Sequence, residues 1–208
     1  MPGPQRLLSR LLEGDFVWLV APYAAWMALM ALLPHTAGAY ALRGAVTAAL
    51  LAASALKLGF RPLATPPGSL CASLGAGVAA GVAVLLVWIA PEVWFGAGRP
   101  VAAADSPYSP EVCGMPLTLV RLASSAFVIP VAEELFFRRW LLGFAGFWWT
   151  VALFAVEHGD RWHVGAVAGI VYGLLAVRFG LKSAIAAHIA TNLGLGAFVV
   201  LAGRWQFW

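Results

Sequence analysis

The ten residues 131–140, VAEELFFRRW, place two adjacent glutamates and an arginine inside an apolar part of the chain. A charged side chain at the centre of a bilayer costs about 2.5–3.5 kcal/mol on insertion scales, so Glu133, Glu134 and Arg138 need partners or water if this segment crosses a membrane. Glu134 precedes Arg138 by four residues, the order that favours an ion pair on one helix face. Glu133 lies about 100° around the helix from Glu134 and is expected to face a cavity. The alternative is a structural ion-pair cluster of all three at the membrane boundary.

The composition of the whole chain indicates a membrane protein. Of its 208 residues, 62% are hydrophobic and 11% are charged, whereas a soluble domain has about 25% charged residues. The net charge is only +4, and the Lys and Arg residues lie between apolar runs instead of forming a basic stripe. This pattern excludes a soluble fold and argues against nucleic acid as a partner. Cys71 and Cys113 are far apart and predict neither a disulfide framework nor a structural zinc site.

The apolar runs predict an all-α, polytopic transmembrane helix bundle in a single domain, residues 1–208. A span needs about 20 mostly apolar residues. By that criterion we expect about seven spans, with six and eight as the bounds, at 16–34, 40–60, 69–96, 116–142, 146–159, 163–178 and 181–202. The fifth is short. The segment 98–115 is a polar loop, and leucines and arginines alternating over residues 6–12 predict a short N-terminal interfacial helix.

The positive charges near the ends of the spans predict an orientation. One side of the predicted topology has eight of them, Arg6, Arg10, Lys57, Arg61, Arg138, Arg139, Arg178 and Lys182, and the other has four, Arg43, Arg99, Arg161 and Arg204. The positive-inside rule then places the N-terminus in the cytoplasm and the 98–115 loop outside.

Glycines at four-residue spacing allow helix backbones to approach closely. They occur at Gly77 and Gly81 in the third span and at Gly165, Gly169 and Gly173 in the sixth. We interpret them as packing positions.

Two further polar pairs lie at helical spacing. Phe154 and His158 are four residues apart near the end of the fifth span, and His188 and Asn192 are four apart in the seventh, so each pair shares a helix face. A single intramembrane histidine often only makes a hydrogen bond between helices. Taken together with Glu133, these residues predict a site in which Glu133 and His158 deprotonate a water while His188 and Asn192 donate to an oxyanion.

A metal site is the alternative for the same residues. Glu133, His158 and His188 are suitable zinc ligands, with water in the fourth position. The residues leave both mechanisms open. We interpret four further polar residues as solvated boundary groups, namely His35, His163, Asp160 and Glu157, of which Glu157 is a weak substitute base.

These motifs resemble the CAAX-protease and bacteriocin-processing family of intramembrane endopeptidases (CPBP, also called Abi), which includes the type II CAAX prenyl endopeptidases. The family pattern is EExxxR, FxxxH and HxxxN on successive helices. It corresponds here to residues 133–138, 154–158 and 188–192, and the resemblance covers a core of residues 117–202. Two features differ from the pattern: the gap from Arg138 to His158 is short, and Arg139 stands where a small residue is common.

The resemblance implies an endopeptidase with Glu133 as catalytic base and His158 sharing the water. It also implies that His188 and Asn192 serve the oxyanion and that Glu134, Arg138 and Phe154 support the site. A mechanism without a cofactor is favoured, with zinc as the alternative. The expected substrate is a membrane-anchored or lipidated protein or peptide, and the expected location is a bacterial inner membrane. Bacteriocin processing, immunity and removal of C-terminal anchors remain open, as does the oligomeric state.

The signature motifs of other classes of intramembrane protease are absent from this sequence. It contains no HExxH, GxSG or GxGD motif, which argues against site-2, rhomboid and presenilin types. The alternative outside the enzymes is a transporter or an immunity-type binding protein with the same polar residues as its ligand or proton site.

Overall fold

The computed structural model of the chain describes residues 15–59, 70–96 and 99–208. All regular structure in these ranges is helical, which confirms the predicted all-α polytopic bundle. The predicted interfacial helix at 6–12 lies outside the described residues.

Among the residues that the structure describes, six helices are long and apolar enough to cross a membrane. Their bounds are α2 (Asp15–Leu32), α3 (Ala37–Leu58), α4 (Leu70–Phe95), a continuous rod from Met115 to Ala145, α10 (Trp162–Phe179) and α11 (Leu181–Ala202). The predicted fifth span forms α9 (Phe147–Glu157), whose 11 residues are too few to cross a bilayer alone. Short helices occupy the connections, namely η2 (Ala103–Asp105), α5 (Pro110–Cys113) and η5 (Gly159–Arg161), and a further one, η6 (Trp205–Phe207), follows α11.

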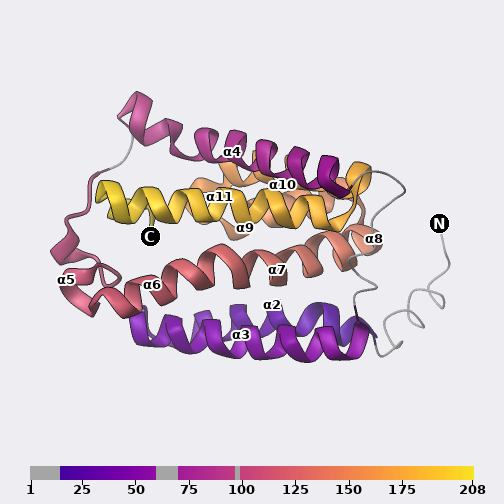
Figure 1. The fold of residues 1–208 in the computed structure, drawn as a ribbon, viewed down its shortest axis with the longest axis horizontal. Helices are drawn as coiled ribbons and strands as arrows, with labels where there is room; N and C mark the ends of the chain where they lie inside the picture. Colours follow the sequence, from indigo (N-terminus) through magenta and orange to yellow (C-terminus); the bar gives the residue numbers. More distant parts are fainter. Residues whose placement is uncertain (1–14, 60–69, 97–98) are drawn as a thin grey trace.

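The rod from Met115 to Ala145 changes its helical register twice. It consists of α6 (Met115–Ala123), the π-helical η3 (Ser124–Val128), α7 (Ile129–Glu134), the π-helical η4 (Leu135–Leu141) and α8 (Leu142–Ala145). In the view of Figure 1 the rod runs between the pair α2 and α3 and the pair α4 and α11. Its central turn, α7, therefore faces the interior of the bundle.

Helices α4 and α11 pack with their backbones in contact. A Cβ atom at Gly77 or Gly81 would collide with the backbone carbonyl of Ser183 or Ala187, respectively. The close approach allows Ser183 Oγ to donate a hydrogen bond across the interface to a backbone carbonyl of α4 at 2.7 Å. The predicted packing role of the two glycines is confirmed.

The second glycine series provides the surface on which α9 packs. A Cβ at Gly165 would lie 3.0 Å from the Cβ of His158, and one at Gly169 would lie 3.3 Å from Cδ1 of Phe154. The glycine face of α10 thus allows both residues of the FxxxH motif, Phe154 and His158, to pack closely against the bundle.

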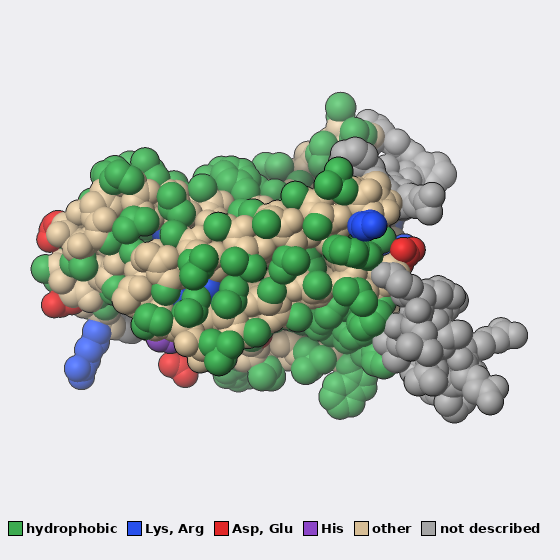
Figure 2. Space-filling model, turned by 90° about the horizontal axis from the view of Figure 1, so that it is seen from below, with side chains coloured by type: hydrophobic (Ala, Val, Ile, Leu, Met, Phe, Trp, Pro, Cys, Tyr) green, Lys and Arg blue, Asp and Glu red, His purple; other side chains and the backbone are tan. Residues whose placement is uncertain are grey.

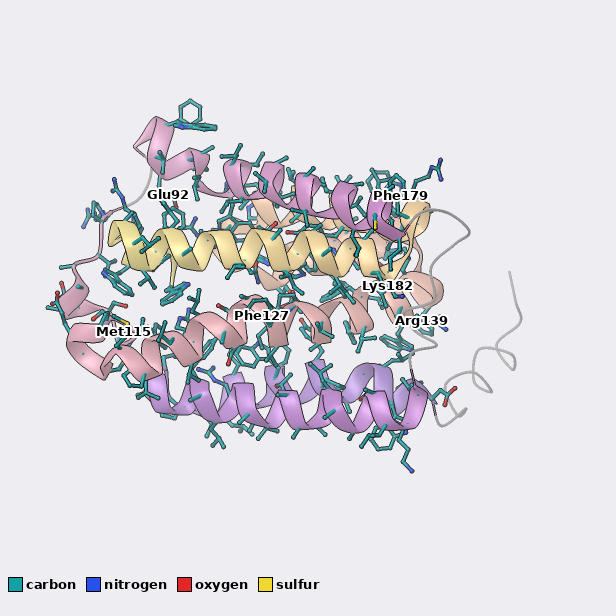
Figure 3. All side chains as sticks on the ribbon, in the orientation of Figure 1. Glu92, Met115, Phe127, Arg139, Phe179 and Lys182 are labelled. Atoms are coloured by element: carbon teal, nitrogen blue, oxygen red, sulfur yellow. The ribbon has the colours of Figure 1, made fainter. Side chains whose placement is uncertain are left out.

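The surface is that of a membrane protein. On the face shown in Figure 2, hydrophobic side chains cover the middle and most charged side chains lie towards the two ends. Figure 3 shows Glu92 and Met115 near one end and Arg139 and Lys182 near the other.

Two arginines that the orientation count includes near the ends of predicted spans are buried inside the bundle. The exposed fractions of Arg43 and Arg138 are only 1% and 5%, so neither side chain is a charge at the membrane surface. Without them the predicted count is seven against three, and it still favours a cytoplasmic N-terminus.

Candidate active site

The paired glutamates lie on α7, between the two π-helical segments. Glu133 and Glu134 are both buried. Single π-helical turns inserted into α-helices are frequent at functional sites, because they change the direction in which the following side chains point. The rod thus brings two carboxylates into the bundle with different surroundings.

Pro130 explains how Asn192 is held. In η3 the Ile129 N–H bonds to the carbonyl of Ser124, five residues back. The next bond in this register would join residue 130 to Ser125, but proline has no N–H to donate. The Ser125 carbonyl is therefore free, and Asn192 Nδ2 donates to it at 2.9 Å. This bond fixes the Asn192 amide across the interface between α11 and the rod.

Glu134 is enclosed by two basic groups. Its Oε1 lies 3.0 Å from the NH1 nitrogen of Arg138, which is the ion pair that the four-residue spacing predicts. The same oxygen lies 2.9 Å from Nδ1 of His188. Since an ionised carboxylate can only accept hydrogen bonds, Nδ1 carries the proton and Nε2 of His188 points away from Glu134.

Phe154 forms an aromatic support for three groups of the site. The Arg138 guanidinium lies 4.1 Å from the centroid of its ring. The ring centroids of His158 and His188 lie 4.7 and 5.9 Å away. Phe154 itself is completely buried, so the FxxxH motif supplies the packing surface as well as a histidine.

His188 is held on a second side by Tyr172. The two rings stack with their centroids 4.8 Å apart and their planes at 26°. The Tyr172 hydroxyl donates to Thr191 Oγ1 at 2.7 Å, which keeps the tyrosine in place. Nε2 of His188 then lies 3.6 Å from Glu133 Oε2.

Glu133 has the His188 ring as its only ion-pair partner among the described residues. Its Oε2 is buried and makes no hydrogen bond to any residue that the structure describes. A buried polar atom without a partner calls for a ligand or a water. Glu134 also has one oxygen, Oε2, without a hydrogen bond to a described residue, so the two glutamates differ in their basic partners: Arg138 and His188 sequester Glu134, and Glu133 is available.

His158 has a defined tautomer. Its Nδ1 lies 2.6 Å from the Phe154 carbonyl oxygen, and a carbonyl can only accept, so Nδ1 carries the proton. In the neutral ring Nε2 is then an acceptor. His158 can accept a hydrogen bond from a water without losing its own anchor.

Two cavities meet at these residues. The larger has a volume of about 600 Å³ and the smaller about 180 Å³. Both are lined by Glu133, His158 and Asn192, and His188 lines the smaller one. Tyr108 and Trp208 extend the larger cavity towards the end of the bundle that holds Met115. The four residues predicted from sequence thus come together from three segments of the chain: α7, the end of α9, and α11.

Glu157 was interpreted as a solvated boundary group, and this was wrong. Its side chain is only 12% exposed, it accepts a hydrogen bond from the Tyr23 hydroxyl, and it lines the larger cavity. The position at the end of α9 concealed this role, because α2 covers it. His35, Asp160 and His163 are exposed, as expected.

Comparison with known proteins supports the family predicted from the motifs. Residues 115–194 match the family of type II CAAX prenyl endopeptidases described as Rce1-like. The match includes all three motifs, so the predicted resemblance is confirmed for this part of the chain. A search of curated proteins and a search of solved structures each found no match. The chain is an integral membrane protein, and the family is one of peptidases.

Proposed function

We propose that the chain is an intramembrane endopeptidase that hydrolyses a peptide bond of a membrane-anchored or lipidated protein, with Glu133 as the general base. The observation that carries this proposal is the asymmetry of the two glutamates. Glu134 is held between Arg138 and His188, while Glu133 has no arginine partner among the described residues and lines both cavities.

Glu133 begins the reaction by taking a proton from a water in the cavity, while Nε2 of His158 accepts that water's second hydrogen bond. The water oxygen forms a bond to the carbonyl carbon of the substrate, and the π electrons of the C=O bond move to the carbonyl oxygen. When the C–N bond breaks, Glu133 returns the proton to the leaving amine. Both groups line the two cavities, so one water can reach each of them.

The oxyanion is stabilised from α11. One hydrogen of the Asn192 amide is used by the Ser125 carbonyl, and the second is available. His188 donates from Nε2 when its ring is protonated, a form that Glu134 stabilises through Nδ1. Donors aimed at a developing charge in a site shielded from water supply a large share of catalysis.

Glu134, Arg138 and Phe154 act through the residues that they hold. Glu134 orients His188, Arg138 neutralises Glu134, and the Phe154 ring supports Arg138 and both histidines. None of the three has to touch the substrate for the site to depend on it.

Zinc held by Glu133, His158 and His188 is the alternative mechanism. Among the described residues no three His, Cys, Asp or Glu side chains lie close enough together to hold a metal ion. We propose the carboxylate mechanism, in which no metal is required. Cleavage that persists in a strong chelator, together with metal analysis of the purified protein, would distinguish the two.

The experiment uses the full-length protein with single-span reporter proteins in a bacterial inner membrane. Replacing Glu133 with Gln keeps the side-chain shape and removes the base, so we expect cleavage to fall about a hundred- to ten-thousand-fold. His158→Ala should also reduce cleavage strongly. Glu111→Gln is the matched control, because Glu111 is exposed on α5, and it should cleave like wild type.

Two outcomes would contradict the proposal. Unchanged cleavage by Glu133→Gln with loss in Glu157→Gln would move the base to the neighbouring helix. Wild-type protein that cleaves no reporter and instead binds one would favour the non-enzymatic binding protein.

A further inference from the structure

Two arginines outside the motifs line the larger cavity. Arg43 comes from α3, which precedes the matched segment, and Arg121 comes from α6. Arg43 is almost completely buried. Arg121 lines the smaller cavity as well, together with Glu133 and His158.

Aromatic rings hold both guanidinium groups. Arg43 lies 5.5 Å from the Trp26 ring centroid and 5.3 Å from that of Tyr40. Arg121 lies 4.2 Å from Tyr40, 3.8 Å from Tyr108 and 4.9 Å from the ring of Trp208. The Tyr40 ring thus contacts both cations. Rings contact the face of a guanidinium and leave the N–H groups in its plane free to bind an anion.

Those N–H groups lack partners in the part of the chain that the structure describes. Nε and one terminal nitrogen (NH2) of Arg43, and Nε of Arg121, are buried without a hydrogen bond. The described carboxylates form no ion pair with either arginine, although Arg138 is paired with Glu134 and Arg161 with Glu92. The protein therefore supplies counter-ions to other arginines and none to these two.

Two neighbouring cations inside a membrane protein are costly without an anion. An anion that binds both would offset the repulsion and complete their hydrogen bonds. Arginine binds carboxylates with two parallel hydrogen bonds, which gives both strength and orientation.

We propose that Arg43 and Arg121 form a subsite for a carboxylate of the peptide substrate, which rests on the proposed function and extends it to substrate choice. The same cavity connects the two arginines to Glu133 and His158, so a peptide bound by its carboxylate places a nearby peptide bond at the base. The carboxylate is either the C-terminus of the peptide or an acidic side chain. A lipid phosphate fits less well, because aromatic rings enclose the arginines and the cavity is that of the catalytic residues.

The test measures binding and cleavage of four versions of one peptide. The C-terminus is a free acid or an amide, and an internal residue is Asp or Asn. Charge-assisted hydrogen bonds predict that wild type prefers the version with the recognised carboxylate by about tenfold to a hundredfold. The pair of peptides that shows the preference identifies which carboxylate is bound.

Arg43→Gln and Arg121→Gln should each bring the ratio between the acidic peptide and its neutral counterpart close to one. Arg43→Lys should keep part of the preference for the acidic peptide. Arg204→Gln removes an exposed charge near the same end of the bundle and should keep the full preference. Thermal unfolding in detergent checks that each variant is folded. We expect no loss of stability, because each Gln replaces a buried cation without a counter-ion.

The proposal is overturned if wild type binds and cleaves all four peptides equally well. It is also overturned if the arginine variants lose binding of neutral and acidic peptides to the same extent. It is likewise overturned if these variants, purified in mixed micelles, instead lose binding of phosphatidylglycerol relative to phosphatidylcholine. Measuring peptide binding with Glu133→Gln separates the two proposals. A preference for the carboxylate in binding, with no cleavage by wild type, supports the subsite and contradicts the protease. Cleavage by wild type without any such preference supports the protease and contradicts the subsite.

Discussion

At the scale of single residues, the adjacent glutamates differ in what they do for stability. Glu134 neutralises Arg138 and accepts from His188, and the breaking of a buried ion pair leaves an uncompensated charge. Glu133 has no arginine partner among the described residues and lines both cavities. The two side chains are therefore expected to respond oppositely to the same substitution.

Glu134→Gln should lower the free energy of unfolding by about 3–5 kcal/mol, because it leaves the Arg138 charge buried and unpaired. Glu133→Gln should leave stability unchanged or slightly higher, because it removes a charge that is costly to bury. Unfolding in mixed detergent, followed by circular dichroism, measures both. Equal destabilisation by the two variants would show that both glutamates are structural.

Gly165 determines where the His158 ring lies. A methyl group at this position would lie 3.0 Å from Cβ and Cγ of His158, which is too close unless the imidazole moves. Displacing a catalytic group by about 1 Å can cost about a hundredfold in rate, so Gly165→Ala should reduce cleavage by at least tenfold without unfolding the protein. Gly38→Ala, at a position with open space around it, is the control. Wild-type cleavage by Gly165→Ala would show that the His158 position is not critical.

The sequence predicted the local relations of this site and missed those that need tertiary structure. The Glu134 and Arg138 pair follows from spacing on one helix, and it forms. Nothing in the sequence relates Tyr23 to Glu157, or Arg43 to Arg121, because each pair joins distant segments. Arg43 was counted as a charge near the end of a span, because the neighbouring Ala and Gly residues do not reveal the aromatic rings that enclose it.

At the scale of elements, hydrophobic length predicted the helices and could not predict the register changes in the rod. The predicted span 116–142 became a rod from Met115 to Ala145. An α-turn and a π-turn can carry the same apolar residues, so periodicity does not distinguish them. Pro130 was the available signal, since its missing N–H leaves a carbonyl for another donor.

Pro130→Ala tests whether that missing N–H matters. The new N–H can bond to the Ser125 carbonyl and compete with Asn192, whose amide would then be free to rotate. We expect cleavage to fall about tenfold, because the Asn192 amide would be misaligned as an oxyanion donor in only a fraction of the molecules. The stability of the variant should equal or exceed that of wild type. Pro116→Ala is the control, because Pro116 is in the first turn of α6, where a helix N–H has no partner in any case. Unchanged cleavage by Pro130→Ala would show that the hydrogen bond between Asn192 and the Ser125 carbonyl does not contribute to catalysis.

At the scale of the whole molecule, glycine spacing predicted which helices approach closely, although not their partners. Gly77 and Gly81 pack against α11, and Gly165 and Gly169 receive α9. Both contacts position motif residues: α11 carries His188 and Asn192, and α9 carries Phe154 and His158. The small residues thus contribute to the site indirectly, by determining how near the motif-bearing helices lie to the rod.

The orientation of the bundle decides from which side a substrate reaches the cavity. The larger cavity extends past Tyr108 and Trp208 to the end that holds the 99–114 segment, and the positive-inside rule places that end outside the cytoplasm. In a Cys113→Ser background, a cysteine at Ala104, which is exposed in η2, should therefore react with a membrane-impermeant maleimide in intact cells. Cys71, exposed at the start of α4 at the opposite end, should react only after the membrane is opened. The reverse labelling pattern would place the cavity on the cytoplasmic side, and substrates would then have to approach from within the cell.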